Sequence, residues 1–404
     1  MLPITPGKNL IIVPKSMVQD GYTPHPLGPL HVASMDADTF IADNANEPDL
    51  VVEETLSLAK PKVVGVPMYT AGRVESLRIL RLVKEAGAIT VAGGPHVSVM
   101  TEQLATHYPF IDHLVVGDGE LAWKAIVSGS SGLPRITRMR VPSFDTLPLP
   151  AWNKLDFDRY LERGDRVHRE NDLRVVPRVS LVFSRGCTGS CAFCSAWHVS
   201  GKYRHYSVGW MTKYLISLWN SGARHLVWQD DCMTSDREAT MQLCGVLKQF
   251  KFSSFGTTRI DCMDGEMVRT MADAGFYALS FGLESGSPYI LQKMNKKTDN
   301  SNAFEIREAV SKAGMAFIAL MVQGYPYETD KERQETLDFL RKLAPDKVNA
   351  IDHTMVMPGT QLYVECKRAG LLTDDFWLGT EPYYIYRGGL PGACVPRFLV
   401  GKVN

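Results

Sequence analysis

The sequence predicts an α/β protein with two domains: a flavodoxin-like (Rossmann-like) domain followed by a partial (β/α)6 barrel. Short apolar runs alternate with segments of helical periodicity along most of the 404 residues, as in folds built from parallel βα units. A stretch rich in glycine, serine and proline, from residue 128 to residue 150, separates two such series. We therefore expect domains at 1–130 and 177–360, joined by a linker at 131–176 and followed by a C-terminal cap at 361–404.

Five short apolar runs predict the strands of the first domain. They lie at residues 10–13, 39–42, 63–66, 89–92 and 113–116. The intervening segments, such as 74–86, carry apolar residues at helical spacing. Since ligands bind at the carboxyl ends of the strands in such open sheets, the loops after strands three, four and five are the candidate binding loops.

Six further runs predict the strands of the second domain. They lie at residues 179–183, 225–229, 255–257, 277–281, 315–322 and 348–352. Six βα units are too few for a closed eight-stranded barrel, so we expect an open, partial barrel. Its chemistry is expected just after each strand, at the carboxyl ends.

Composition excludes several classes of protein. Lys and Arg total 44, as do Asp and Glu, so nothing indicates non-specific binding to nucleic acid through a strong positive field. No stretch approaches the ~20 apolar residues of a membrane span, and the N-terminus does not resemble a signal peptide. We expect a cytoplasmic protein. Eight cysteines are too sparse for a disulfide scaffold.

Three cysteines crowd into one loop directly after the first barrel strand. Cys187, Cys191 and Cys194 have C-x-x-x-C-x-x-C spacing, with glycines that let the backbone curl. Three thiolates can hold three irons of a cubane cluster and leave the fourth iron open. The same cysteines with His198 have acceptable zinc spacing, and cysteines without metal are a third alternative.

This loop, with Phe193 before its last cysteine, resembles that of the radical S-adenosylmethionine (SAM) superfamily, and more narrowly its cobalamin-binding class. The resemblance extends over nearly the whole chain, including the ending Pro-Gly-Thr-Gln-Leu-Tyr at residues 358–363. It implies a 4Fe-4S cluster on Cys187, Cys191 and Cys194 whose open iron binds SAM. Reductive cleavage of SAM would then give a 5′-deoxyadenosyl radical.

Two acidic residues and a cysteine follow the second barrel strand. The resemblance suggests that Asp230 binds the amino group of SAM, and it leaves Asp231 and Cys232 as possible catalytic residues. Alternatively, the carboxylates cap the next helix. Cys232 is either a hydrogen donor close to the radical or a small buried residue, and we favour the second role.

Later strand ends supply further candidates for SAM binding. Arg259 could clamp a carboxylate or the ribose, and Glu284 could accept from a ribose hydroxyl or the ammonium group. An Arg259–Glu284 ion pair is the structural alternative for both. Gly324, after the fifth strand, completes this set.

The loops of the first domain resemble the cobalamin-binding domain of the same class, through Gly-Gly-Pro-His and Gly-Asp-Gly-Glu. The candidate cobalamin contacts are Met68, Tyr69, Thr70, Gly93, Gly94, His96, Gly117, Gly119 and Glu120. The Asp-x-His-x-x-Gly motif that supplies an axial histidine elsewhere is missing. Bound cobalamin would therefore lack that ligand, and His96 could be an ordinary loop histidine.

The resemblance implies a cobalamin-dependent methyltransferase that acts on an unactivated carbon through a 5′-deoxyadenosyl radical and methylcobalamin. The alternatives are a radical cyclase, rearrangement or oxidation enzyme with cobalamin as electron carrier or absent, and a non-enzymatic zinc or corrinoid carrier. A methylthiotransferase is disfavoured because no cysteine precedes Cys187. We expect a one-electron donor of the flavodoxin or ferredoxin type and an unidentified small-molecule or peptide substrate.

The aromatic residues near the C-terminus either line a pocket over the barrel mouth or pack a terminal cap; they are Phe376, Trp377, Tyr383, Tyr384 and Tyr386.

Overall fold

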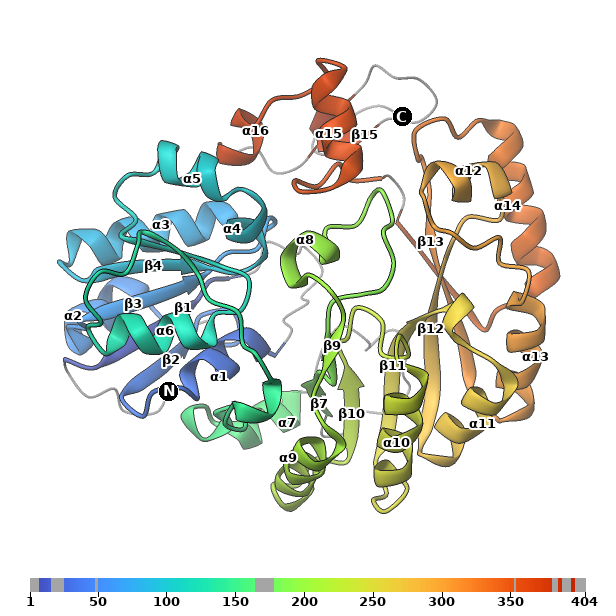
Figure 1. The fold of residues 1–404 in the computed structure, drawn as a ribbon, viewed down its shortest axis with the longest axis horizontal. Helices are drawn as coiled ribbons and strands as arrows, with labels where there is room; N and C mark the ends of the chain where they lie inside the picture. The colour runs from blue at the N-terminus through green and yellow to red at the C-terminus, as the bar shows by residue number, and fades with distance from the viewer. Residues whose placement is uncertain are drawn as a thin grey trace. The chain divides into compact units, whose positions relative to one another are not determined.

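The computed structural model describes residues 7–15, 25–47, 50–163, 178–351, 354–379, 384–386 and 394–396. The chain forms two compact units, one from Met1–Val175 and Asp374–Thr380, the other from Val176–Thr373 and Glu381–Asn404 (Figure 1). Part of the predicted linker, 164–176, lies outside the described residues. So does most of the predicted cap beyond residue 379, except for a pair of antiparallel strands, β15 (Tyr384–Tyr386) and β16 (Cys394–Pro396). None of the described helices is long and apolar enough to cross a bilayer.

The first unit is built on a parallel sheet with the strand order β2-β1-β3-β4-β5-β6. Its strands are β1 (Asn9–Val13), β2 (Thr39–Asp43), β3 (Val63–Pro67), β4 (Ile89–Gly93), β5 (His113–Val116) and β6 (Ile136–Arg138). The first five agree with the predicted ranges to within one residue at each end. Their apolar residues are buried nearly throughout, as expected for a parallel sheet covered on both faces.

Helices cover both faces of this sheet, with α3 and α6 on opposite sides (Figure 1). The helices are α1 (Leu27–Ala33), α2 (Val52–Ala59), α3 (Arg73–Glu85), α4 (Pro95–Val99), α5 (Thr101–His107), α6 (Glu120–Val127) and α7 (Phe157–Arg163). The indole of Trp123 on α6 lies against Gly65 of β3, where a Cβ would come within 2.8 Å of the ring. The indole N–H also donates to Thr39 Oγ1 at 3.0 Å, so this contact fixes α6 on the sheet.

The sixth strand, β6, lies in the stretch predicted as linker. Of its three residues only Thr137 is buried, so it has no apolar run for a pattern search to detect. Arg135, just before β6, donates to three main-chain carbonyls, those of Ala105, Tyr108 and Ile111, at 2.8–2.9 Å. These bonds hold the edge strand in place.

The segment around α16 (Asp375–Leu378) packs within the first unit although it follows the barrel in sequence. The Tyr108 hydroxyl donates to the carbonyl of Leu378. Arg73 is fully buried, donates to the carbonyl of Phe376 at 3.4 Å, and lies over the ring of Trp377 at 5.1 Å. Phe376 and Trp377 are therefore packing residues here.

The second unit is an open parallel sheet with the order β14-β13-β12-β11-β10-β7. Its strands are β7 (Arg178–Leu181), β10 (His225–Trp228), β11 (Ser253–Arg259), β12 (Phe276–Glu284), β13 (Ala316–Val322) and β14 (Lys347–Ile351). These are the six strands predicted from the sequence. The edge strands β7 and β14 do not pair with each other, so this is the open, partial barrel that the sequence predicts.

Helices follow the strands of this sheet, and α10, α11, α13 and α14 lie on its outer side (Figure 1). The helices are α9 (Val208–Asn220), α10 (Arg237–Leu247), α11 (Gly265–Asp273), α12 (Pro288–Lys293), α13 (Ala303–Lys312), α14 (Asp330–Leu343) and α15 (Gln361–Arg368). One insertion interrupts the alternation. Between β7 and α9 lie the short antiparallel strands β8 (Ser184–Arg185) and β9 (Arg204–His205) and the helix α8 (Ala196–Ser200).

Two glycines at helix ends of the barrel provide a matched test of backbone strain. Gly275 has φ +95°, and a Cβ there would lie 2.2 Å from the carbonyl oxygen of Phe252. We expect Gly275→Ala to lower the free energy of unfolding by about 3 kcal/mol, because the left-handed backbone and the collision both oppose it. Gly314→Ala is the control: φ is +70°, nothing lies within 4 Å, and the expected loss is about 1 kcal/mol. Equal losses in denaturant unfolding would contradict this account.

Candidate active site

The cysteine loop follows the carboxyl end of β7, where the sequence predicts it. Cys187, Cys191 and Cys194 lie between β8 and α8. The N–H of Gly189 donates to Cys187 Sγ at 3.3 Å, and the N–H of Ala196 donates to Cys194 Sγ at 3.5 Å. Both bonds stabilise negative charge on sulfur.

The donor set fits an iron–sulfur cluster. Three thiols on one loop, two of them accepting main-chain N–H bonds, are the ligands that such clusters use. Within the described ranges no three His, Cys, Asp or Glu side chains converge on one point, so the thiols are not gathered around a common centre. His198, the fourth ligand of the zinc alternative, is exposed on α8.

Two carboxylates from the end of β10 hold the start of this loop. Asp230 is buried and accepts from the main-chain N–H groups of Phe183 and Ser184, the latter at 2.6 Å. Asp231 Oδ2 accepts from the N–H of Gly186 at 3.1 Å. Burial raises the pKa of Asp230 to about 7, while the donated hydrogen bonds act in the opposite direction.

The contacts of these two carboxylates are within the protein. The Asp230 carboxylate accepts from main-chain donors and so anchors the cysteine loop. Neither carboxylate is the cap of the next helix, because Asp236 performs that role by accepting from the N–H of Ala239 at 2.9 Å. Cys232 is fully buried, with Thr258 Oγ1 at 3.8 Å from its sulfur.

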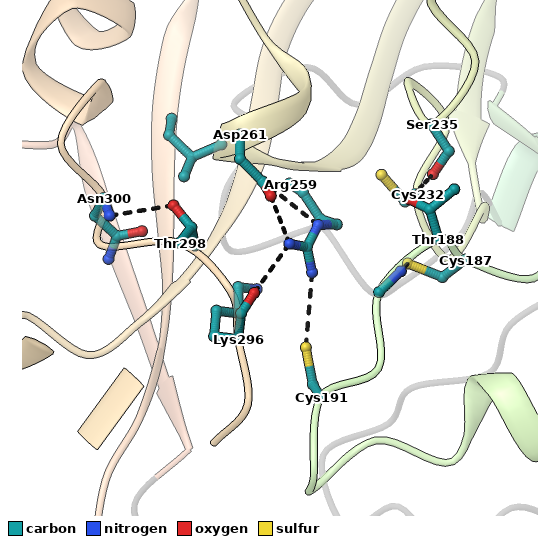
Figure 2. A network of polar contacts seen from close by, with 12 residues as sticks. Cys187, Thr188, Cys191, Cys232, Ser235, Arg259, Asp261, Lys296, Thr298 and Asn300 are labelled. Atoms are coloured by element: carbon teal, nitrogen blue, oxygen red, sulfur yellow. Dashed lines mark hydrogen bonds and ion pairs between the residues drawn. The ribbon is translucent and has the colours of Figure 1, made fainter. Parts of the chain in front are cut away.

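Arg259, at the end of β11, faces the cysteine loop (Figure 2). Its guanidinium donates to both carboxylate oxygens of Asp261, at 3.0 and 2.6 Å, and to the carbonyl of Lys296 at 3.1 Å. Its Nη1 lies 3.7 Å from Cys191 Sγ. The fork predicted to bind SAM is thus already engaged by protein groups.

The Arg259–Glu284 ion pair considered from the sequence does not form. Glu284 instead accepts from Lys296 Nζ at 2.8 Å, and both side chains are largely buried. Glu284 has φ +67° and stands where the pairing of β12 with β13 shifts register. Lys296 was missed by the sequence analysis; its only signal was a lysine pair shortly after the fourth barrel strand.

Gly324, after β13, has its own partner within the loop. Its φ is +64°, a conformation that favours glycine. Its N–H donates to Glu328 Oε2 at 2.6 Å, and Glu328 is buried. This N–H is therefore used to close the loop.

The candidate loops after β3 and β4 in the first unit are bound to each other. The N–H of Met68 donates to the carbonyl of Gly93 at 2.7 Å, and the N–H of His96 donates to the carbonyl of Met68 at 3.0 Å. A Cβ on Gly94, where φ is +100°, would lie 3.1 Å from the Met68 oxygen. Gly94 is therefore required by the approach of the two loops.

His96 and Thr70 point inward. His96 is fully buried, its Nδ1 lies 3.1 Å from Thr70 Oγ1, and burial lowers its pKa to about 3. Met68 is fully buried too. Of the residues in these two loops that were predicted to contact cobalamin, Tyr69 is the exposed one, at 48%.

The loop after β5 differs in being partly open. Gly117 is exposed, has φ +76°, and has nothing within 4 Å of the position of a Cβ. Gly119 lies against Val32, and Glu120 is buried at the start of α6. Tyr69 and Gly117 are thus the most exposed of the predicted contacts.

The loop anchor predicts a defect in metal loading. In Asp230→Asn an amide nitrogen replaces one of the two acceptor oxygens. Because this nitrogen is itself a donor, main-chain N–H groups of the cysteine loop would be left buried without an acceptor. We expect iron per chain after anaerobic reconstitution to fall several-fold. Asp264→Asn is the control, because Asp264 accepts a main-chain N–H, that of Met267, as the cap of α11 and lies outside the cysteine loop. Full iron loading of Asp230→Asn would contradict the anchoring role.

The buried histidine predicts a pH dependence of stability. His96 has a pKa far below its ordinary value, so the folded state resists protonation while the unfolded chain takes up a proton near pH 6.5. The contribution of the neutral imidazole to the free energy of unfolding is complete above pH 6.5 and is lost as the pH falls toward 3. Between pH 6.5 and 5 the loss amounts to about 2 kcal/mol. We expect His96→Gln to be less sensitive to pH over this range in denaturant unfolding; an unchanged pH dependence would contradict this.

Comparisons with known proteins agree with this architecture. Residues 181–340 match the Radical SAM superfamily, and residues 17–127 match the B12 binding domain. The chain is 27% identical over 387 residues to the uncharacterized methyltransferase PH0819 of Pyrococcus horikoshii, with 88% of this chain and 82% of the relative covered. It is 24% identical to the cytidylyl-2-hydroxyethylphosphonate methyltransferase of Streptomyces wedmorensis, with 84% and 72% covered.

Two further similarities are informative. The anaerobic magnesium-protoporphyrin IX monomethyl ester cyclase of Rubrivivax gelatinosus is 24% identical, with 74% of this chain and 57% of the cyclase covered. The fold resembles that of the radical SAM methyltransferase TsrM from Kitasatospora setae, solved with cobalamin and a [4Fe-4S] cluster bound. The TM-score is 0.73 at 15% identity, with 90% of this chain and 78% of TsrM covered. With its B12 binding domain followed by a radical SAM domain, this chain belongs to the cobalamin-binding class of radical SAM enzymes.

Proposed function

We propose that this enzyme is a cobalamin-dependent methyltransferase that acts on an unactivated carbon. The observation that carries the proposal is the presence, in one chain, of a B12 binding domain and of a three-cysteine loop at the carboxyl end of the first barrel strand. The relatives named as methyltransferases over more than four fifths of the chain support methyl transfer as the outcome.

In this proposal Cys187, Cys191 and Cys194 hold a 4Fe-4S cluster and leave one iron for SAM. When bound, the reduced cluster supplies the electron that cleaves SAM to a 5′-deoxyadenosyl radical, and cobalamin supplies the methyl group. Asp230 and Asp231 fix the loop that carries the first cysteine. The loop anchored in this way would supply the three thiol ligands of the cluster, and the iron left without a protein ligand would bind SAM.

The Glu284–Lys296 pair lies at the end of β12 and provides both charges that an amino acid needs. SAM carries an ammonium and a carboxylate. When SAM binds, Glu284 can pair with the ammonium of SAM and Lys296 with its carboxylate, in place of their pairing with each other. We assign the contact with SAM to this pair. Asp231 and Cys232 stay candidates for contact with the reacting groups.

For cobalamin we assign the contacts to Tyr69 and to the open loop at Gly117. An exposed aromatic ring can pack on a flat macrocycle, and a glycine without neighbours permits close approach of the backbone. His96 does not fit an axial ligand because it is buried and held by Thr70.

A second candidate is a radical cyclisation, rearrangement or oxidation without net methyl transfer. The similarity to a cyclase favours it. In either case the cluster needs a one-electron donor, for which we propose a flavodoxin or ferredoxin, and we propose a cytoplasmic location.

The first test is composition. We expect protein reconstituted without oxygen in the presence of hydroxocobalamin to retain, after desalting, about four irons and one corrinoid per chain. Four irons without corrinoid would exclude methyl transfer through cobalamin and favour the second candidate. Zinc in place of iron would contradict both.

The second test is product identity. Methyl transfer predicts both S-adenosylhomocysteine and 5′-deoxyadenosine under reducing conditions, whereas the second candidate predicts 5′-deoxyadenosine alone. The Cys187→Ala, Cys191→Ala, Cys194→Ala triple variant is expected to form no 5′-deoxyadenosine, because no cluster remains to deliver the electron. Undiminished reductive cleavage of SAM by this variant would refute radical SAM chemistry in both forms.

A further inference from the structure

The position of Arg259 relative to the cysteine loop carries an inference beyond cofactor binding. Arg259 is 8% exposed and directs Nη1 toward Cys191 Sγ, 3.7 Å away (Figure 2). Within the part of the chain that the structure describes, Arg259 is the positively charged side chain that donates to a predicted cluster ligand, Cys191. A charge this well shielded from water acts strongly on its neighbours.

The cysteine loop is shaped to receive this guanidinium. Gly189 lies between the first two cysteines, and a Cβ there would lie 2.6 Å from Arg259 Nη1 and 3.4 Å from Cys187 Sγ. Gly189 has no left-handed φ that would require glycine for the backbone. Its missing side chain therefore makes room for the guanidinium beside the sulfur atoms of Cys187 and Cys191.

Two acceptors on the opposite side fix the orientation. Asp261 binds Nε and Nη2 in a bidentate pair, and the carbonyl of Lys296 accepts a further bond from Nη2. A fork held along one edge cannot turn away, so Nη1 stays directed at the loop. Lysine could not reproduce this geometry, because its single ammonium cannot bind Asp261 side-on and contact sulfur as well.

We propose that Arg259 sets the reduction potential of the cluster and is not primarily a SAM ligand. The proposal rests on the proposed function, since it needs a cluster on Cys187 and Cys191. Reduction adds one negative charge to the cluster. A fixed cation and an N–H···S bond stabilise the reduced form more than the oxidised form, and so raise the potential.

The test is an EPR-monitored redox titration of the reconstituted protein without SAM. In Arg259→Gln we expect the equilibrium constant for one-electron reduction to fall about tenfold, a decrease of about 59 mV in midpoint potential. Arg259→Lys keeps the charge without the fork, so an intermediate value is expected. Arg237→Gln is the matched control: this exposed arginine of the same barrel pairs with Asp264 at 3.3 Å, and its loss should leave the midpoint unchanged.

Gly189→Ala provides an independent variant that retains every charge. The added methyl group would come within 2.6 Å of Nη1 and so push the loop and the guanidinium apart. The midpoint should therefore fall in the same direction as in Arg259→Gln. If Arg259→Gln does not load iron, Gly189→Ala and Arg259→Lys decide the question. An unchanged midpoint in the loaded variants would overturn the proposal.

Two readouts separate the possible failures. If the unmodified protein holds no 4Fe-4S cluster, the proposed function itself fails. If it holds a cluster and Arg259→Gln leaves the midpoint unchanged but weakens SAM binding in equilibrium titration, Arg259 is a SAM ligand. The proposal requires the converse, a lowered midpoint measured without SAM.

Discussion

The geometry of the barrel mouth depends on one set of hydrogen bonds, those from the main chain at residues 183–186 to Asp230 and Asp231. A parallel strand that leaves its sheet has N–H groups without partners, and burying them unpaired is costly. The buried carboxylate of Asp230 and the exposed carboxylate of Asp231, just after the neighbouring strand β10, supply the acceptors. In turn, the donors offset the cost of burying Asp230. The start of the cysteine loop is thereby fixed to two strands at once.

This constraint explains why the insertion after β7 can be long without losing its position. The chain from residue 186 to residue 203 makes only one helix, α8, before it returns as β9 to pair with β8. Within the loop, the N–H of Ala192 donates to the carbonyl of Met294 at 2.8 Å, and the Asn295 side chain donates to the carbonyl of Ser190 at 2.8 Å. Asp230 and Asp231 hold the outgoing end, and the β8–β9 pairing closes the insertion, so the three cysteines lie between fixed points.

The sequence was sufficient for the strands but not for the partners of charged side chains. Strands buried on both faces appear as continuous apolar runs, which is why the ranges at 10–13 and 113–116 agreed with β1 and β5. Edge strand β6 has no such run and was missed. For Arg259 the sequence offered Glu284, whereas the backbone brings Asp261 to the fork and turns Glu284, at φ +67°, toward Lys296. Which carboxylate pairs with an arginine depends on backbone dihedral angles, and the spacing of residues in the sequence does not determine these angles.

Glycines in binding motifs illustrate the same point. Gly94 was predicted to contact cobalamin, and the glycines of the cysteine loop were expected to let the backbone curl. In the structure, Gly94 is required by Met68 of the neighbouring loop, and Gly189 by the guanidinium of Arg259. In both cases the missing Cβ lets two parts of the protein approach each other. Loops locked in this way lose little further entropy when a ligand binds. A glycine-rich signature can therefore reflect preorganisation of the protein itself, and the residue that occupies the space of the missing side chain is the one to mutate together with the glycine.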